Sequence, residues 1–142
     1  MNKKQPIRVY IEYEETRTGG EADDPEDEWT SHATEYVSVK FLNLYKEPPA
    51  HKFFYDSIEL PNDKMIKLKE LYLAVVRYST GDTFHHTEGA WYIAGIAPTS
   101  DIAKAMLDEE TKPSKGKIRN FKRWEHYFNS LEGTEIHKVN LI

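Results

Sequence analysis

Two nearly continuous apolar runs, separated by a polar stretch, constrain this chain more than any other feature. Leu71 to Tyr78 and Ala90 to Ala97 both lack the alternation of a half-buried strand, so each run predicts a strand that is covered on both faces. The stretch between them, Ser79 to Gly89, has the polar character expected of a connection between antiparallel neighbours. The sequence therefore predicts a central β-hairpin that serves as the axis of the fold.

The segments around this hairpin predict further strands and two helices. Period-two alternation predicts strands at Ile7 to Tyr13 and Thr34 to Tyr45, which could form a long hairpin, with Val37, Val39 and Phe41 on one face of the second strand. A short edge strand is expected at Phe53 to Leu60 and a final strand at Thr134 to Ile142. Thr99 or Ser100 is expected to cap a first helix, with Ile102, Ala105 and Met106 facing the sheet. A second helix is expected where apolar residues recur at spacings of three and four, namely Ile118, Phe121, Trp124, Phe128 and Leu131, with Gly133 as its C-terminal cap. The expected fold class is α+β, with a mostly antiparallel sheet of about five to six strands and two helices packed on one face.

The composition predicts a single domain over residues 1–142. A chain of 142 residues is close to the usual domain size, and it has no cysteine, which is compatible with a reducing compartment. Residues Met1 to Pro6 lack the apolar region of a signal peptide, and no apolar run approaches the roughly 20 residues of a membrane span. We therefore expect a cytoplasmic protein without a membrane partner. The net charge of -5 argues against nucleic acid as a partner.

Charge is distributed unevenly along the chain, with acidic residues early and basic residues late. The acidic segment is expected to be a flexible surface loop at about residues 18–33. Its carboxylates could imitate a nucleic-acid backbone and occupy the basic groove of a partner protein. The residues predicted to bind such a partner are Glu21, Asp23, Asp24, Glu26, Asp27, Glu28 and Trp29. A solvated loop without a partner explains the same composition.

A small-ligand site is the alternative. The hairpin connection supplies hydroxyls, a carboxylate and a glycine, which are the ingredients of a phosphate-binding nest and equally of a tight turn. The second predicted helix would add cations on its outer face, although its aromatic residues fit a buried core face. The residues of this alternative nucleotide site are Ser79, Thr80, Gly81, Asp82, Thr83, Lys115, Lys117, Arg119, Lys122 and Arg123.

Neither catalysis nor metal binding has a sequence signature here. His85 and His86 are adjacent, so on a strand they point to opposite faces and cannot readily share one metal ion. The other four histidines do not have the spacing of metal ligands. The chain also lacks a cysteine nucleophile and a Gly-x-Ser-x-Gly motif. We therefore expect no metal, no cofactor and no catalytic residue.

One resemblance narrows the class of function. The stretch from Val76 to Phe84, which includes Tyr-Ser-Thr-Gly-Asp-Thr-Phe, is followed by Gly89, an apolar strand, Trp124 and Leu131-Glu132. This pattern resembles a group of small uncharacterised bacteriophage and prophage proteins, and it covers about half of the chain. The group often has a glycine directly after the phenylalanine, where this chain has His85. The resemblance implies a phage protein that acts inside the host cell, and short phage accessory proteins commonly bind and disable a host component.

The sequence thus predicts a non-enzymatic phage accessory protein that inhibits a host or anti-phage defence protein by binding it. A nucleotide-binding or nucleotide-sequestering protein is the alternative. Exposed strand edges, together with an aromatic content of 13%, would also permit a homodimer.

Overall fold

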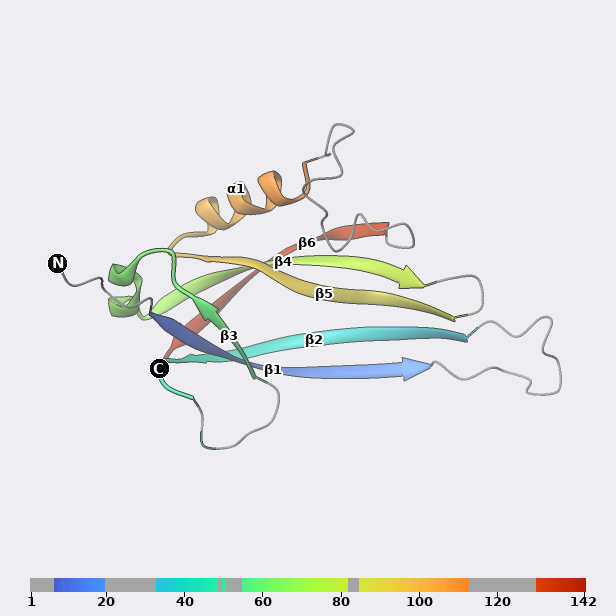
Figure 1. The fold of residues 1–142 in the computed structure, drawn as a ribbon, viewed down its shortest axis with the longest axis horizontal. Coiled ribbons are helices and arrows are strands. Elements are labelled where there is room, and N and C mark those ends of the chain that lie inside the picture. The colour runs from blue at the N-terminus through green and yellow to red at the C-terminus, as the bar shows by residue number, and fades with distance from the viewer. Residues whose placement is uncertain (1–6, 20–32, 49, 51–54, 82–84, 113–129) are drawn as a thin grey trace.

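The computed structural model describes residues 7–19, 33–48, 50, 55–81, 85–112 and 130–142. Two long hairpins dominate these residues, and a single α-helix lies beside one of them (Figure 1). The elements in chain order are β1 (Arg8–Gly19), β2 (Ala33–Tyr45), β3 (Tyr55–Glu59), the 3₁₀ turn η1 (Asp63–Lys67), β4 (Glu70–Gly81), β5 (His85–Ala97), α1 (Ser100–Glu110) and β6 (Ser130–Leu141). No helix among the described residues is long and apolar enough to span a membrane.

The predicted fold class is wrong, because the described structure is mostly sheet and has one α-helix instead of two. Residues 118–128 of the second predicted helix lie outside the described residues, but its last apolar residue, Leu131, and its predicted cap, Gly133, both lie in β6. Leu131 pairs with Tyr78, and Gly133 pairs with Arg77. Pairing with the central strand therefore overrides the helical spacing at this end of the segment, since propensity and periodicity yield to tertiary context.

The two predicted hairpins are present. β1 and β2 form one antiparallel pair, in which the alternating face predicted for the second strand turns inward and buries Val37 and Phe41. β4 and β5 form the other pair and are longer than expected, because Ser79 to Gly81 and His85 to Gly89 belong to the strands. Only residues 82–84 separate β4 from β5, and these lie outside the described residues. The predicted edge strand is also present, as β3 beside β1.

β2 joins the two hairpins by dividing one of its edges between two partners. β1 occupies one edge of β2, so the other edge takes β5 near Ala33 to Tyr36 and β6 at Asn43 and Leu44, both in parallel. β4 lies between β5 and β6, so the sheet order is β3-β1-β2-β5-β4-β6, and the β2–β6 contact folds the sheet back on itself. The sheet therefore consists of two halves that enclose the core.

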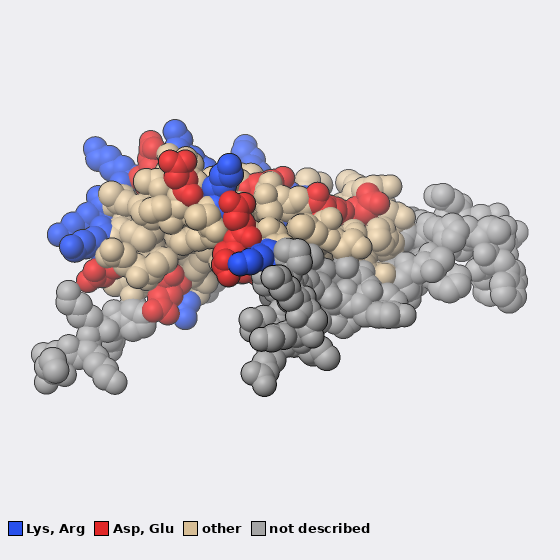
Figure 2. Space-filling model, turned by 90° about the horizontal axis from the view of Figure 1, so that it is seen from above, with Lys and Arg blue, Asp and Glu red and all other residues tan. Residues whose placement is uncertain are grey.

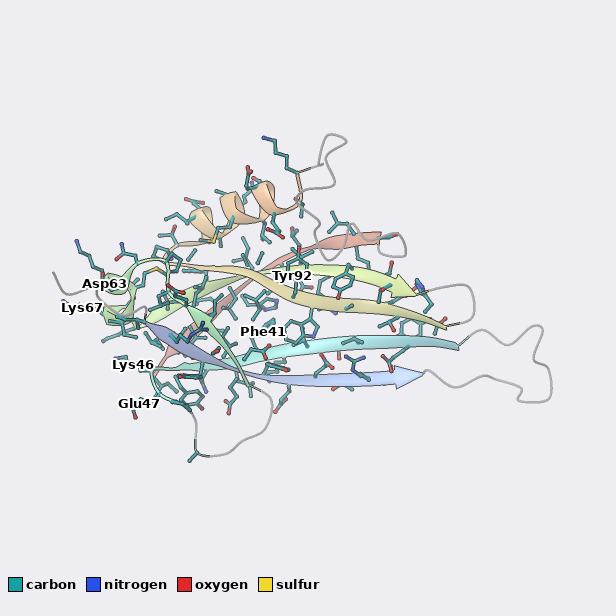
Figure 3. All side chains as sticks on the ribbon, viewed as in Figure 1. Phe41, Lys46, Glu47, Asp63, Lys67 and Tyr92 are labelled. Carbon is teal, nitrogen blue, oxygen red and sulfur yellow. The ribbon has the colours of Figure 1, made fainter. Side chains whose placement is uncertain are left out.

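The main core lies between these halves. In Figure 3, Phe41 points into the space between the β1–β2 hairpin and the β4–β5 hairpin. The fully buried members of this core come from β1, β2, β4 and β5, and the largest are Ile11, Leu44, Leu71, Leu73 and Ile96. Burial of each such side chain stabilises the fold by about 1.5–3 kcal/mol before the entropic cost of ordering the chain.

A second, smaller core covers the opposite face of the β4–β5 hairpin. Ala74 and Val76 of β4 pack there against Ala103 and Leu107 of α1. The predicted start of this helix is confirmed, because the Thr99 hydroxyl accepts a hydrogen bond from the backbone N–H of Ile102. Of its predicted inner face, Met106 packs against this core, whereas Ala105 is exposed and Ile102 is 44% exposed. The fully buried positions are Ala103 and Leu107 instead. The two cores explain why β4 reads as a continuous apolar run.

Gly89 lies where β5 separates from β2. Its backbone angle φ is +80°, in the left-handed region that residues other than glycine rarely adopt. A Cβ atom at this position would lie 2.3 Å from the carbonyl oxygen of Val37, so even a methyl group has no room. The two strands can approach one another at this point only because the residue is glycine.

Substitution of Gly89 by alanine should therefore destabilise the protein by at least about 2 kcal/mol, from left-handed strain and from the clash with β2. Gly133→Ala is the matched control, because a Cβ there meets no atom within 4 Å. We expect that variant to stay within about 1 kcal/mol of wild type. Urea denaturation followed by circular dichroism measures the free energy of unfolding of both variants. Equal values would contradict the role of Gly89 in the close approach of β5 and β2.

Candidate functional site

A pocket of about 660 Å³ lies between the two hairpins. We call it the inter-hairpin pocket. It is lined by Ile11, Tyr13, Glu15 and Arg17 of β1, Val37 of β2, Asp56, Ser57 and Ile58 of β3, Tyr78 of β4 and Ala90, Trp91, Tyr92 and Ile93 of β5. The pocket opens where β5 stops pairing with β2, because the hairpins diverge beyond Tyr36 and Glu88. Its position therefore follows from the way in which β2 divides its edge.

A chain of charged hydrogen bonds crosses the wall of this pocket. The Trp91 indole nitrogen donates to Glu15 Oε2 at 2.7 Å, and Arg17 Nε donates to Glu15 Oε1 at 2.7 Å. Arg17 Nη1 also donates to Glu35 Oε1 at 2.6 Å. Both carboxylate bonds raise the pKa of Arg17, so this guanidinium stays charged. These hydrogen bonds connect β5, β1 and β2 beside the pocket.

Aromatic rings line the same pocket beside these charges. Tyr13 meets Trp91 edge-on with ring centroids 4.9 Å apart, and Trp91 meets Phe41 edge-on at 5.3 Å. Burial raises the pKa of the Tyr13 phenol, and the negative charges of Asp56 and Glu15 raise it further, while Arg17 opposes them. An aromatic wall next to carboxylates is an environment that suits a cationic side chain.

A second cavity of about 650 Å³ continues the pocket along β5 toward α1. We call it the helix-side groove, and it is lined by Ile58, Glu59, Pro61, Ala94, Gly95, Ile96, Ile102, Ala105, Met106, Glu109 and Glu110. Ile58 lines both cavities, which together follow β5 on one side and β3 on the other. Their lining residues contain five carboxylates, Glu15, Asp56, Glu59, Glu109 and Glu110, and one guanidinium, Arg17. This combined surface is therefore acidic.

Arg77 fixes the place where the pocket begins. Its Nε donates to the Gly89 carbonyl at 3.1 Å, and its Nη2 donates to the Val37 carbonyl at 2.8 Å. Its Nη1 lies 3.4 Å from Glu135 Oε1, and its side chain is only 16% exposed. The guanidinium thus connects β4 to β5, β2 and β6 with one rigid group, a task that suits its planar set of donors.

Carboxylates of β6 complete the polar cluster around Arg77. Glu135 also lies 2.9 Å from the His137 ring, which meets Phe41 edge-on with ring centroids 4.8 Å apart. The Glu132 carboxylate accepts the backbone N–H of Gly89 with both oxygens, at 3.0 and 3.2 Å. The cluster therefore fixes β6 to β5 across the central strand.

The residues predicted to bind a partner, Glu21, Asp23, Asp24, Glu26, Asp27, Glu28 and Trp29, lie outside the described residues, so that assignment stays a prediction. Of the alternative nucleotide site, Ser79, Thr80 and Gly81 lie in β4, where they pair with β6 and β5. The remaining members of that site, Asp82, Thr83, Lys115, Lys117, Arg119, Lys122 and Arg123, lie outside the described residues.

Histidine does not gather with carboxylates in a metal-like group within the described part of the chain. No three or more His, Asp or Glu side chains converge there as metal ligands would. His86 of β5 has Glu88 at 3.7 Å, whereas His137 of β6 has Glu135. The described histidine side chains thus lie on different strands and have separate carboxylate partners.

The sequence analysis did not identify the residues that shape the inter-hairpin pocket, although the sequence contains two signals for them. Arg77 is the one cation inside the apolar run of Leu71 to Tyr78, and a charge in such a run requires a buried partner. Glu15 and Arg17 continue the period-two face that Ile11 and Tyr13 begin, so they point inward with it. The contributions of β3 and Trp91 had no comparable signal, because they depend on how the hairpins diverge.

Substitution of Arg77 by lysine should reduce the free energy of unfolding by about 1–3 kcal/mol, because an ammonium group cannot reproduce the three-strand hydrogen bonding of the guanidinium. Arg8→Lys is the matched control, since Arg8 is exposed and donates only to Ser57 at 3.3 Å among the bonds described. That variant should stay within about 0.5 kcal/mol of wild type. Urea denaturation measures both, and equal losses would refute the special role of Arg77.

Tyr13 should make stability depend on alkaline pH. Its folded-state pKa is raised above the usual value of about 10, so the native state holds this proton more tightly than the unfolded chain does. The resulting stabilisation is complete below about pH 10 and is lost as the pH rises through the folded pKa. Urea denaturation from pH 8 to 11 should therefore show a steeper loss for wild type than for Tyr13→Phe. Parallel profiles would contradict the raised pKa.

Comparisons with known proteins do not extend this picture. No family model matches the chain, and no match was found among curated proteins or among solved structures. The resemblance to phage proteins therefore stays a prediction, and no residue role is transferred to this chain from another protein.

Proposed function

We propose that this chain acts by binding another protein, without catalysis, and that the partner presents a basic surface. In the phage context that the sequence resemblance implies, the partner would be a host or anti-phage defence protein that is inhibited when its basic site is covered. The observation that carries the proposal is the acidic surface formed by the inter-hairpin pocket and the helix-side groove.

The position of this surface supports binding to a macromolecule. Two adjacent cavities of about 660 and 650 Å³ form an elongated site, which is larger than one small ligand usually requires. Aromatic residues, which are enriched in protein interfaces, line the inter-hairpin pocket. The carboxylates of the combined surface come from β1, β3 and α1, so a partner would contact several elements at once.

The charge distribution supports a basic partner. Figure 2 shows acidic and basic side chains interspersed over the face that carries α1, with Lys and Arg prominent at the end on the left. The two cavities differ from that mixed face, because their lining has five carboxylates against one guanidinium. Complementary charge mainly increases the rate and the specificity of association. The acidic segment predicted at about residues 18–33 would add to the same attraction.

The test begins with capture of a partner from a host lysate and continues with the purified partner. We expect its affinity to fall about tenfold or more between 0.05 and 0.5 M salt, because charge attraction is screened. Joint neutralisation by Asp23→Asn, Asp24→Asn, Glu26→Gln, Asp27→Asn and Glu28→Gln should weaken binding severely. Joint Asp56→Asn and Glu59→Gln should weaken it about threefold to tenfold. Isothermal titration calorimetry measures each value.

The matched control replaces two exposed carboxylates outside the two cavities, Glu14→Gln with Glu47→Gln. This pair removes the same charge as the Asp56 and Glu59 pair, so it separates a local effect from a change in net charge. An affinity that is insensitive to salt, to the five joint loop substitutions and to the joint Asp56 and Glu59 substitutions would refute the proposal.

A further inference from the structure

Within the described part of the chain, β5 has an edge without a partner strand beside both cavities. β2 pairs with this edge only at residues 85–88, so among the described strands β4 alone pairs with β5 from Ala90 to Ala97. In an antiparallel pair, alternate residues direct their backbone N–H and C=O groups away from the partner strand. Such groups border the inter-hairpin pocket at residues 90–93 and the helix-side groove at residues 94–96.

We infer that this edge binds an extended, basic segment of the partner protein, which adds to β5 as a short strand in the position that β2 leaves after Tyr36. Strand addition of this kind takes its affinity from main-chain hydrogen bonds and its specificity from pockets for alternate side chains. The inference rests on the proposed function, since it names how that partner is held.

A bulge limits the length of the added strand. Ile93 and Gly95 pair with the consecutive residues Val75 and Ala74, so Ala94 is an extra residue in β5. A bulge of this kind bends a strand and interrupts further pairing at its edge. The partner segment therefore pairs along residues 90–93, a distance of about 13 Å at 3.3 Å per residue, and then continues through the helix-side groove without a regular ladder.

The charges along this path select a basic segment. Alternate side chains of an added strand point to opposite faces, so those on one face enter the inter-hairpin pocket. A cationic side chain there meets the Tyr13 and Trp91 rings and the carboxylates of Asp56 and Glu15. Burial raises the pKa of the Tyr13 phenol, and the negative charges of Asp56 and Glu15 raise it further. Farther along β5, Glu59 and Glu109 line the groove.

A second copy of this chain is the competing occupant, because β3 also has an edge without a partner strand among the described residues. Copies of one chain would bring the same acidic lining against each other unless a basic segment intervened, so like charges oppose that arrangement. Light scattering after size-exclusion chromatography decides between the two. A dimer that dissociates when the basic peptide described below is added would overturn the assignment to a partner protein.

The binding experiment uses synthetic peptides and isothermal titration calorimetry. The probe is an acetylated and amidated octapeptide of alternating lysine and valine. Two further versions carry methyl groups on the backbone nitrogens of all lysines or of all valines, which keeps the charge but blocks hydrogen bonds along one edge. We expect the parent peptide to bind, at least one methylated version to bind about tenfold more weakly or worse, and a glutamate–valine peptide not to bind.

NMR spectroscopy and charge variants of the protein identify where the peptide binds. Backbone amide shifts should change most at residues 90–93, and joint Asp56→Asn and Glu59→Gln should weaken the parent peptide about threefold or more, whereas joint Glu14→Gln and Glu47→Gln should not. If both methylated peptides bind as well as the parent, strand addition is wrong and only charge attraction stands. Failure of the parent peptide to bind also overturns the inference. The proposed function is judged separately, by the salt and loop-charge dependence of the captured partner.

Discussion

The guanidinium of Arg77 occupies the point at which this fold divides. β2 must leave β5 in order to reach β6, and at the point of departure the carbonyls of Val37 and Gly89 both need a donor. A buried carbonyl without a hydrogen bond costs about 1–3 kcal/mol. Arg77 supplies both donors and takes its charge partner from Glu135, while Gly89 provides the space that lets the two strands come so close. This small polar cluster therefore joins β2, β4, β5 and β6 at the point where β2 leaves β5.

Two apolar layers hold the halves of the sheet around that cluster. The inner face of β4 packs between the hairpins and its outer face packs under α1, so the central strand is buried on both sides. The inner layer is apolar toward the chain termini and becomes polar toward the open end, where Glu15 and Arg17 replace aliphatic side chains on the same face of β1. The apolar core fills the space between the hairpins toward one end, and the change to charged residues on β1 accompanies the inter-hairpin pocket beside it.

The proposed binding surface is a consequence of the same geometry. Because β2 pairs with only a short part of β5, the remaining edge of β5 faces a space that β3 and α1 border but do not fill. Carboxylates from these separate elements converge on the space, although they are far apart in the sequence. A surface that combines an open strand edge, aromatic rings and an excess of negative charge is suited to an extended and basic protein segment.

Much of the local structure could be predicted from the sequence. Period-two alternation marked β1 and β2, continuous apolar runs marked β4 and β5, and Thr99 marked the start of α1, because each signal reflects local burial or capping. The helical spacing that ends at Leu131 failed there, since pairing with β4 outweighed it. Of the candidate site, local signals marked only Arg77, as a charge in an apolar run, and the inward face that carries Glu15 and Arg17. The sequence by itself determined where most of the strands lie and that negative charge is in excess. Only the tertiary structure decided that β2 is shared between two strands, and thus where the groove opens, because that pairing joins residues distant in the chain.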